Sequence, residues 1–126
     1  MNLKTLFLIN AVAALLFGLS FLIMPADTLG WYDVILVPKG GILVARLFGI
    51  NMLGVAVLSW LARPLGASEA LSAIVLSMIV IDGLGFITSL LAMFDGGINN
   101  LGWTTVLLYL LLFLGFAYFR FMKPKG

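Results

Sequence analysis

Four apolar runs of similar length divide the sequence, and each is long enough to cross a bilayer as a helix. They cover residues 4–24, 41–62, 70–94 and 101–121. A helix needs about 20 predominantly apolar residues to span the hydrocarbon core. The chain is 63% hydrophobic and 10% charged, whereas soluble domains carry about 25% charged residues. The sequence therefore predicts an all-α fold, a polytopic membrane four-helix bundle in which residues 1–126 form one transmembrane domain.

The segment 25–40, between the first and second runs, is the longest and least regular connection. Pro25 and Pro38 lie near its ends, with Trp31 and Tyr32 between them. Tryptophan and tyrosine favour the membrane–water interface, which predicts an interfacial segment that lies on the surface or enters the membrane as a short partial helix. Two roles remain open for this segment, a fixed cap packed over the bundle or a lid over a polar site.

Basic residues indicate the orientation of the bundle. An even number of spans places both termini and the turn between the second and third runs on one side, and Lys and Arg concentrate in cytoplasmic loops. That side carries Lys4, Arg63, Arg120, Lys123 and Lys125, whereas the opposite loops offer Lys39. The bias predicts a multi-pass protein of the cell inner (plasma) membrane with cytoplasmic N- and C-termini.

Two charged residues lie deep within the apolar runs, Arg46 in the second and Asp82 in the third. A lone charge near the bilayer centre costs about 2.5–3.5 kcal/mol on insertion scales, so such residues usually face a bundle interior or an opposite charge. The short turn between the runs makes the helices antiparallel, and Arg46 then lies roughly 6 Å in depth from Asp82, a gap that an arginine side chain can bridge. We therefore expect a buried ion pair, completed by Asn51, which either fixes the helix register or forms a functional polar site.

Further polar side chains fall in the same half of the bundle, and the other half is almost entirely Leu, Ile, Val and Phe. The predicted ligand-binding residues are Arg46, Asn51, Asp82, Ser89, Thr104, Thr105 and Tyr109, together with the aromatic side chains of Trp103 and Phe86. An apolar pocket with a few convergent polar groups is the usual form of a small-molecule site. We expect a cavity in the outer half, also walled by Phe17 and closed by an apolar plug, with a fully packed polar network as the alternative.

The absence of cysteine and histidine excludes several kinds of chemistry. Thiol redox reactions, zinc or haem held by these side chains, and nucleophiles paired with histidine all require them. No nucleophile and base can be paired, so an enzyme is the least favoured function, and we expect no catalytic residue, metal or cofactor. The net charge of +2 comes from helix ends rather than from a basic face, which argues against nucleic acid as a partner.

The layout resembles that of small four-span bacterial membrane proteins grouped around DoxX. The resemblance rests on the first span ending in Pro25, on Leu29-Gly30-Trp31, and on the second-span stretch 46–54, RLFGINMLG. The stretch 99–105, NNLGWTT, is similar to the fourth-span entry of other proteins of this size. The resemblance implies a four-helix bundle, and some relatives are linked to quinone-coupled or redox membrane complexes. This chain has no cysteine pair or histidine to support a redox role of its own.

Three functions fit these features. The first is binding of a lipid-like or small amphipathic ligand in the outer-half cavity, with Arg46 as an anionic anchor and Asp82 and Asn51 orienting the ligand. The second is an accessory or assembly subunit of a larger membrane complex, which would use Ala14, Gly18 and the Leu-rich face of the fourth span. The third is a proton-coupled transporter using Asp82, which would require a homodimer because four spans are too few for alternating access.

Overall fold

The computed structural model describes residues 2–34, 38–96 and 98–122, and these residues form an all-α bundle. The long helices are α1 (Leu3–Ile23), α3 (Lys39–Ala62), α4 (Glu69–Phe94) and α5 (Gly102–Ala117). A π-helical turn, η1 (Tyr118–Met122), continues α5, and a short helix, α2 (Pro25–Gly30), follows α1. Four helices are long and apolar enough to cross a membrane, so the fold is that of a multi-pass membrane protein. Their ends differ from the predicted ends by at most two residues.

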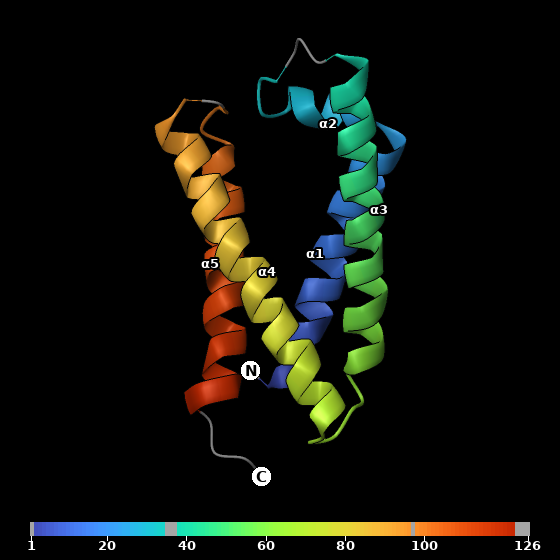
Figure 1. Cartoon of the computed structure of the whole chain (residues 1–126), viewed down its shortest axis with the longest axis vertical. Helices are drawn as coiled ribbons and strands as arrows, with labels where there is room; N and C mark the ends of the chain where they lie inside the picture. The colour runs from blue at the N-terminus through green and yellow to red at the C-terminus, as the bar shows by residue number, and fades with distance from the viewer. Residues whose placement is uncertain (1, 35–37, 97, 123–126) are drawn as a thin grey trace.

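The long helices form two antiparallel pairs, α1 with α3 and α4 with α5 (Figure 1). The pairs come together at the end that holds both chain termini and diverge toward the end that holds α2 and the turn between α4 and α5 (Figure 1). Contacts between the pairs are few compared with the contacts within each pair.

Small residues allow α1 and α3 to pack closely. A Cβ atom on Gly49 of α3 would lie 2.7 Å from the carbonyl oxygen of Gly18 and from the backbone nitrogen of Leu22, both in α1. Ala45 and Ala56 continue the same buried face of α3. Small residues at a membrane helix interface allow the two backbones to approach. Ala14 and Gly18 of α1 are both buried in the bundle.

Pro25 ends α1 and begins α2. Because a proline restricts the residue before it, Met24 leaves the helical region with φ −134° and ψ 64°. Pro25 then occupies the first turn of α2, where its missing N–H costs nothing. The hydroxyl of Thr28, a fully buried residue, donates to the carbonyl oxygens of Ser20 at 2.9 Å and Met24 at 2.8 Å. These bonds fold α2 back onto the end of α1, so the segment after the first span contains a short helix.

An apolar core joins the two pairs at the end with the termini. It consists of Leu6, Phe7, Ala62, Val75, Met78, Leu112 and Phe116. The rings of Phe7 and Phe116 lie 5.2 Å apart between centroids at 58°, a favourable tilted arrangement. The predicted apolar plug is confirmed here by the buried side chains.

At the opposite end the two pairs are joined by hydrogen bonds. The Tyr32 hydroxyl and the Thr105 hydroxyl lie 2.8 Å apart. The backbone N–H of Asn99 donates to the Tyr32 carbonyl at 3.2 Å, and its side-chain amide donates to the Trp31 carbonyl at 3.0 Å. We call Trp31, Tyr32, Asn99 and Thr105 the strap. The prediction of a cap or lid over 25–40 extends to residues 35–37, which lie outside the described residues.

Candidate functional site

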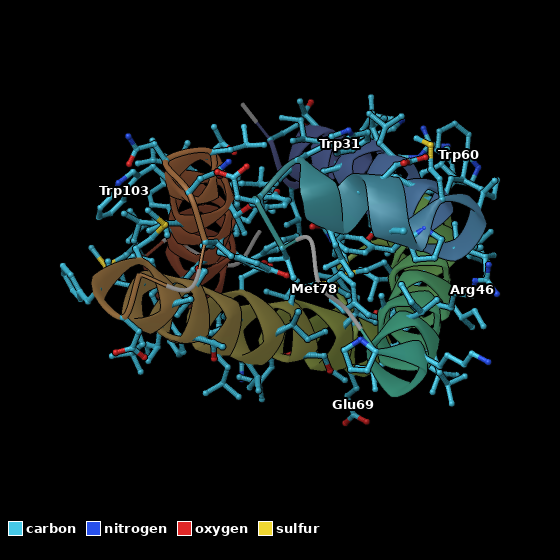
Figure 2. All side chains as sticks on the ribbon, turned by 90° about the horizontal axis from the view of Figure 1, so that it is seen from above. Trp31, Arg46, Trp60, Glu69, Met78 and Trp103 are labelled. Atoms are coloured by element: carbon cyan, nitrogen blue, oxygen red, sulfur yellow. The ribbon has the colours of Figure 1, made fainter. Side chains whose placement is uncertain are left out.

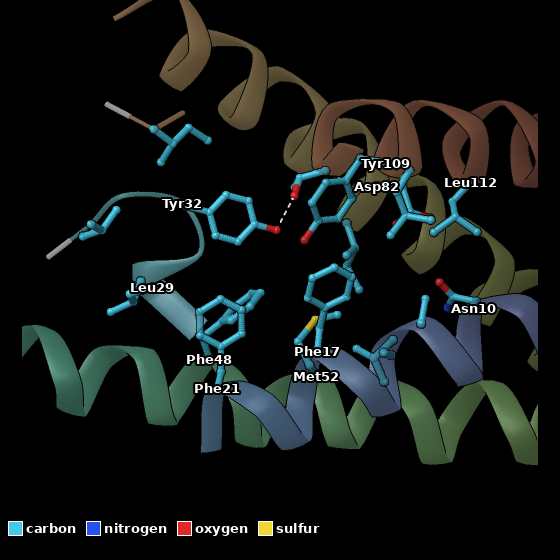
Figure 3. Close-up of a pocket in the computed structure, with 18 residues that line it drawn as sticks. Asn10, Phe17, Phe21, Leu29, Tyr32, Phe48, Met52, Asp82, Tyr109 and Leu112 are labelled. Atoms are coloured by element: carbon cyan, nitrogen blue, oxygen red, sulfur yellow. Dashed lines mark hydrogen bonds between the residues drawn. The ribbon is translucent and has the colours of Figure 1, made fainter. Parts of the chain in front are cut away.

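A cavity of about 240 Å³ lies between the two helix pairs, beneath the strap (Figure 3). Side chains from α1, α3, α4 and α5 line it, together with Leu29, Tyr32 and Val34 from the connection after α1. Its polar lining side chains are Asn10, Tyr32, Asp82, Thr105 and Tyr109, and the remainder are apolar or aromatic. A largely apolar cavity with a few convergent polar groups is the usual form of a small-molecule site.

Asp82 is the charged residue that lines the cavity. It lies on the inward face of α4 with Val75 and Met78, both buried, and the sequence correctly predicts that face. The Asp82 side chain is 3% exposed, and its Oδ2 atom has no hydrogen-bond partner among the described residues. A buried polar atom without a partner costs about 1–3 kcal/mol. Because Asp82 lines the cavity, a group that enters the cavity beside it can supply the missing partner.

Tyr109 and Thr105 of α5 line the same cavity as Asp82. The Tyr109 ring packs on Gly85, one turn of α4 after Asp82, where no side chain obstructs it. The phenol and the Asp82 carboxyl therefore line the same part of the cavity (Figure 3). Thr105 lies one turn earlier on α5 and is hydrogen-bonded to Tyr32 within the strap. The two pairs thus contribute polar groups to one site from both sides.

Aromatic side chains of the other pair form the facing wall. Phe17 and Phe21 come from α1, and Phe48 and Met52 come from α3 (Figure 3). The rings of Phe21 and Phe48 meet edge to face, with 5.1 Å between centroids and 86° between planes. This wall offers apolar area and ring faces to an occupant, while the polar groups come mostly from α4, α5 and Tyr32.

Asn10 closes the cavity toward the apolar core. Its side-chain amide donates to the Ser59 hydroxyl at 2.8 Å and contacts the Met78 sulfur at 3.3 Å. Asn10 and Ser59 are buried, so this contact joins α1, α3 and α4 where the two pairs converge. The bond holds the Asn10 side chain at the cavity floor.

The structure brings three of the predicted site residues to the cavity, namely Asp82, Thr105 and Tyr109, along with the predicted wall residue Phe17. Asp82 lies midway along α4, and the other three lie toward the end away from the termini. The predicted asymmetry is found: a cavity lined by a few polar side chains lies toward one end, and an apolar plug lies at the other.

The predicted ion pair between Arg46 and Asp82 is wrong. Arg46 is exposed and lies at the outer edge of the α1/α3 pair, away from the cavity (Figure 2). The inward face of α3 instead carries Ala45 and Gly49, because close packing against α1 requires small residues. Arg46 follows Ala45 and is rotated about 100° away from it. An arginine in this position can extend its stem along the helix toward the interface.

Asn51 does not complete a pair either. It is exposed, and its side-chain amide donates at 2.8 Å to the carbonyl of Leu47, one turn earlier in the same helix. Ser89 and Thr104 behave similarly, with hydroxyls that donate to the carbonyls of Gly85 and Leu101 at 2.6 Å. These polar groups are satisfied locally, which is a common state for such residues in membrane helices. None of the three lines the cavity.

The two remaining predicted aromatic residues also lie elsewhere. Trp103 is exposed at the outer edge of α5 (Figure 2), and Phe86 is partly buried but is not among the cavity-lining residues. Trp103 lies on a different face of α5 from the lining residues Thr105 and Tyr109, whereas Phe86 lies one turn beyond Asp82 on α4.

Sequence reasoning omitted two polar residues of the site, Asn10 and Tyr32. Asn10 is the single amide in an otherwise apolar span, and that isolation is a signal for a buried polar contact. Tyr32 was assigned to the interface, and nothing near it in the sequence indicates that its hydroxyl meets Thr105, 73 residues away.

Comparison of the chain with protein-family models, with curated proteins and with solved structures found no match. The function is therefore inferred from the cavity and from the residues that line it.

Proposed function

We propose that this chain binds a small amphipathic or lipid-like ligand in the cavity between the two helix pairs. The observation that carries the proposal is the buried Asp82 carboxyl, which has an unpartnered oxygen and belongs to a residue that lines a cavity otherwise rich in aromatic side chains. A structural polar group in a membrane protein is normally paired with another protein group. Asp82 gains such a partner when a ligand occupies the cavity.

The geometry changes how the ligand would be held. Arg46 lies outside the cavity, so it does not anchor the ligand. Asp82 and the Tyr109 hydroxyl hold the polar part of the ligand, while Phe17, Phe21 and Phe48 cover the apolar part. The ligand is small, since about 240 Å³ lies below the roughly 300–1,000 Å³ of drug-sized pockets.

A cavity-filling variant tests this function. Ala13 lines the cavity, whereas its neighbour Val12 is 49% exposed. The substitution Ala13→Trp fills the cavity, and Val12→Trp adds the same bulk on the outside. In native mass spectrometry after mild detergent extraction, we expect a bound small molecule on the wild type and on Val12→Trp but not on Ala13→Trp. Equal retention by both variants, or no bound molecule on any of the three, would contradict the proposal.

The cellular setting forms part of the proposal. The excess of basic residues at the end with the termini supports cytoplasmic termini in the inner membrane of a bacterial cell. The cavity then lies in the half of the bilayer away from the cytoplasm. The resemblance to the DoxX-like group stays a prediction, since no family model matches the chain.

Two alternative functions stay predictions. The accessory-subunit hypothesis loses one of its two surfaces, because Ala14 and Gly18 are buried against α3 and cannot contact a partner. Its other surface, the exposed leucines of α5, faces lipid equally well. The transport hypothesis shares Asp82 with the binding proposal and is tested by proton flux in vesicles, with Asp82→Asn as the control; equal flux in both removes it.

A further inference from the structure

The charge distribution of the cavity indicates what kind of ligand it holds. Of the described residues that line the cavity, Asp82 is the one with a formal charge, and none is Lys or Arg. Arg46, the nearest basic residue expected from the sequence, is exposed on the far side of α3. An anionic ligand group would therefore lie beside a buried carboxyl with no positive charge to balance either, which a low-dielectric site strongly disfavours.

A positively charged group fits the same site. An ammonium group donates hydrogen bonds and carries no acceptor, so it complements the unpartnered Oδ2 atom of Asp82. A charge-assisted bond of this kind is roughly twice as strong as a neutral one. No described residue hydrogen-bonds with the Tyr109 hydroxyl, which therefore remains free to accept a second ammonium hydrogen.

The aromatic walls favour the same charge. Phe17, Phe21, Phe48 and the two lining tyrosines present rings to the cavity from both helix pairs (Figure 3). The face of an aromatic ring attracts a cation, and the attraction is stronger where water is excluded. The acid and the rings thus select for positive charge by two independent interactions.

The size of the cavity limits the apolar body of the ligand. A dry engineered cavity of about 150 Å³ accommodates benzene, and this cavity measures about 240 Å³. One ring, or a short alkyl chain of similar volume, together with an amino group therefore fills it.

We infer that the cavity is a binding site for small amphipathic amines, with the ammonium group held by Asp82 and Tyr109 and the apolar body against the phenylalanine wall. This inference rests on the proposed function and narrows its ligand class. It reverses the charge expected from the sequence, where Arg46 would have selected an anion.

Three probes of matched shape test the inference, namely 2-phenylethylamine, 2-phenylethanol and phenylacetate. Their binding to the purified full-length protein in a non-ionic detergent at neutral pH is measured by isothermal titration calorimetry. The cavity-filled Ala13→Trp variant serves as the blank for partitioning into micelles. We expect the amine to bind at least about tenfold more tightly than the alcohol, because its bond to Asp82 joins two opposite charges, and phenylacetate to give no heat above the blank.

Substitutions then assign the selectivity to Asp82. The change Asp82→Asn keeps the shape and removes the charge, so the amine should lose its roughly tenfold advantage over the alcohol. The change Arg46→Met should leave all three affinities unchanged. Stronger binding of phenylacetate than of the amine, or an amine affinity unaffected by Asp82→Asn, overturns the amine inference and leaves cavity binding intact. No heat above the blank from any probe overturns both.

Discussion

The phenol ring of Tyr109 lies directly against the backbone of Gly85, so that a Cβ atom on Gly85 would lie 2.6 Å from two ring carbons. This contact holds the ring beside Asp82, one turn earlier on α4. Since the glycine is what allows the ring this close, the position of the Tyr109 hydroxyl depends on a residue that does not itself line the cavity.

The substitution Gly85→Ala should displace the Tyr109 ring and weaken binding in the cavity. Overpacking of this kind costs about 1–3 kcal/mol of stability, which thermal unfolding in detergent measures. In a Tyr109→Leu background the same substitution should cost less, because the ring that it meets is gone. An equal loss of stability in both backgrounds would show that the alanine methyl group clashes with a group other than the Tyr109 ring.

Replacing Asp82 by leucine should stabilise the ligand-free protein while abolishing binding of the amine. The carboxyl has an unpartnered buried oxygen, and removing such a group regains about 1–3 kcal/mol. An increase in the unfolding temperature of the purified variant is the measurement. A clear decrease would mean that Asp82 has a stabilising partner in the folded protein.

The substitution Gly49→Ala should separate α1 from α3 and destabilise the bundle by at least about 1–3 kcal/mol, because the new methyl group meets backbone atoms that cannot rotate away. Gly54 in the same helix is the matched control, since a Cβ there meets nothing within 4 Å. Gly54→Ala should be neutral or stabilising by up to about 1 kcal/mol, the difference in helix propensity. Thermal unfolding of the two variants measures the difference, and similar losses of stability in Gly49→Ala and Gly54→Ala would contradict the close contact at Gly49.

Tyr32→Phe and Thr105→Val each remove the same hydrogen bond between the strap and α5. Each change should cost about 0.5–1.5 kcal/mol, and the double variant should cost little more than either single one. Unfolding free energies of the four proteins in the cycle give the coupling. Additive losses would indicate that the two hydroxyls do not interact.

The sequence predicts some elements of this fold well because their signals are local. Span length and hydropathy determine the four helices, and Pro25 determines where α1 ends and α2 begins. The inward face of α4 is also predictable, because Met78 and Asp82 share it with the glycine at position 85. In that helix the acid and the packing residues favour the same face.

In α3 the charged residue and the small packing residues favour different faces, and the prediction that followed the charge is wrong. Arg46 was assumed to face inward because a charge in a membrane needs shelter, but Ala45, Gly49 and Ala56 form the buried face. An arginine reaches the interface on its own long stem, whereas a glycine contact between helices has no substitute. The stripe of small residues is thus the stronger indicator of the inward face in this helix.

The cavity itself could be predicted only in part, because it depends on how the two pairs are placed relative to each other. Polar residues on α4 and α5 are close in sequence and share one pair, which is why Asp82, Thr105 and Tyr109 were found together. Asn10 and Tyr32 belong to the other side. Their positions follow from contacts with residues 49 and 73 positions away, which no periodic pattern within a single span encodes.

The strap has a consequence for the rate at which an occupant leaves. At one end of the cavity interlocked phenylalanines hold the pairs together, and at the other end three hydrogen bonds do so. Breaking a few such bonds is easier than separating a packed core, so we expect the two pairs to separate first at the strap. Substitutions in the strap should then change the rate at which an occupant leaves, whereas substitutions at Asp82 and in the aromatic wall should change its equilibrium affinity.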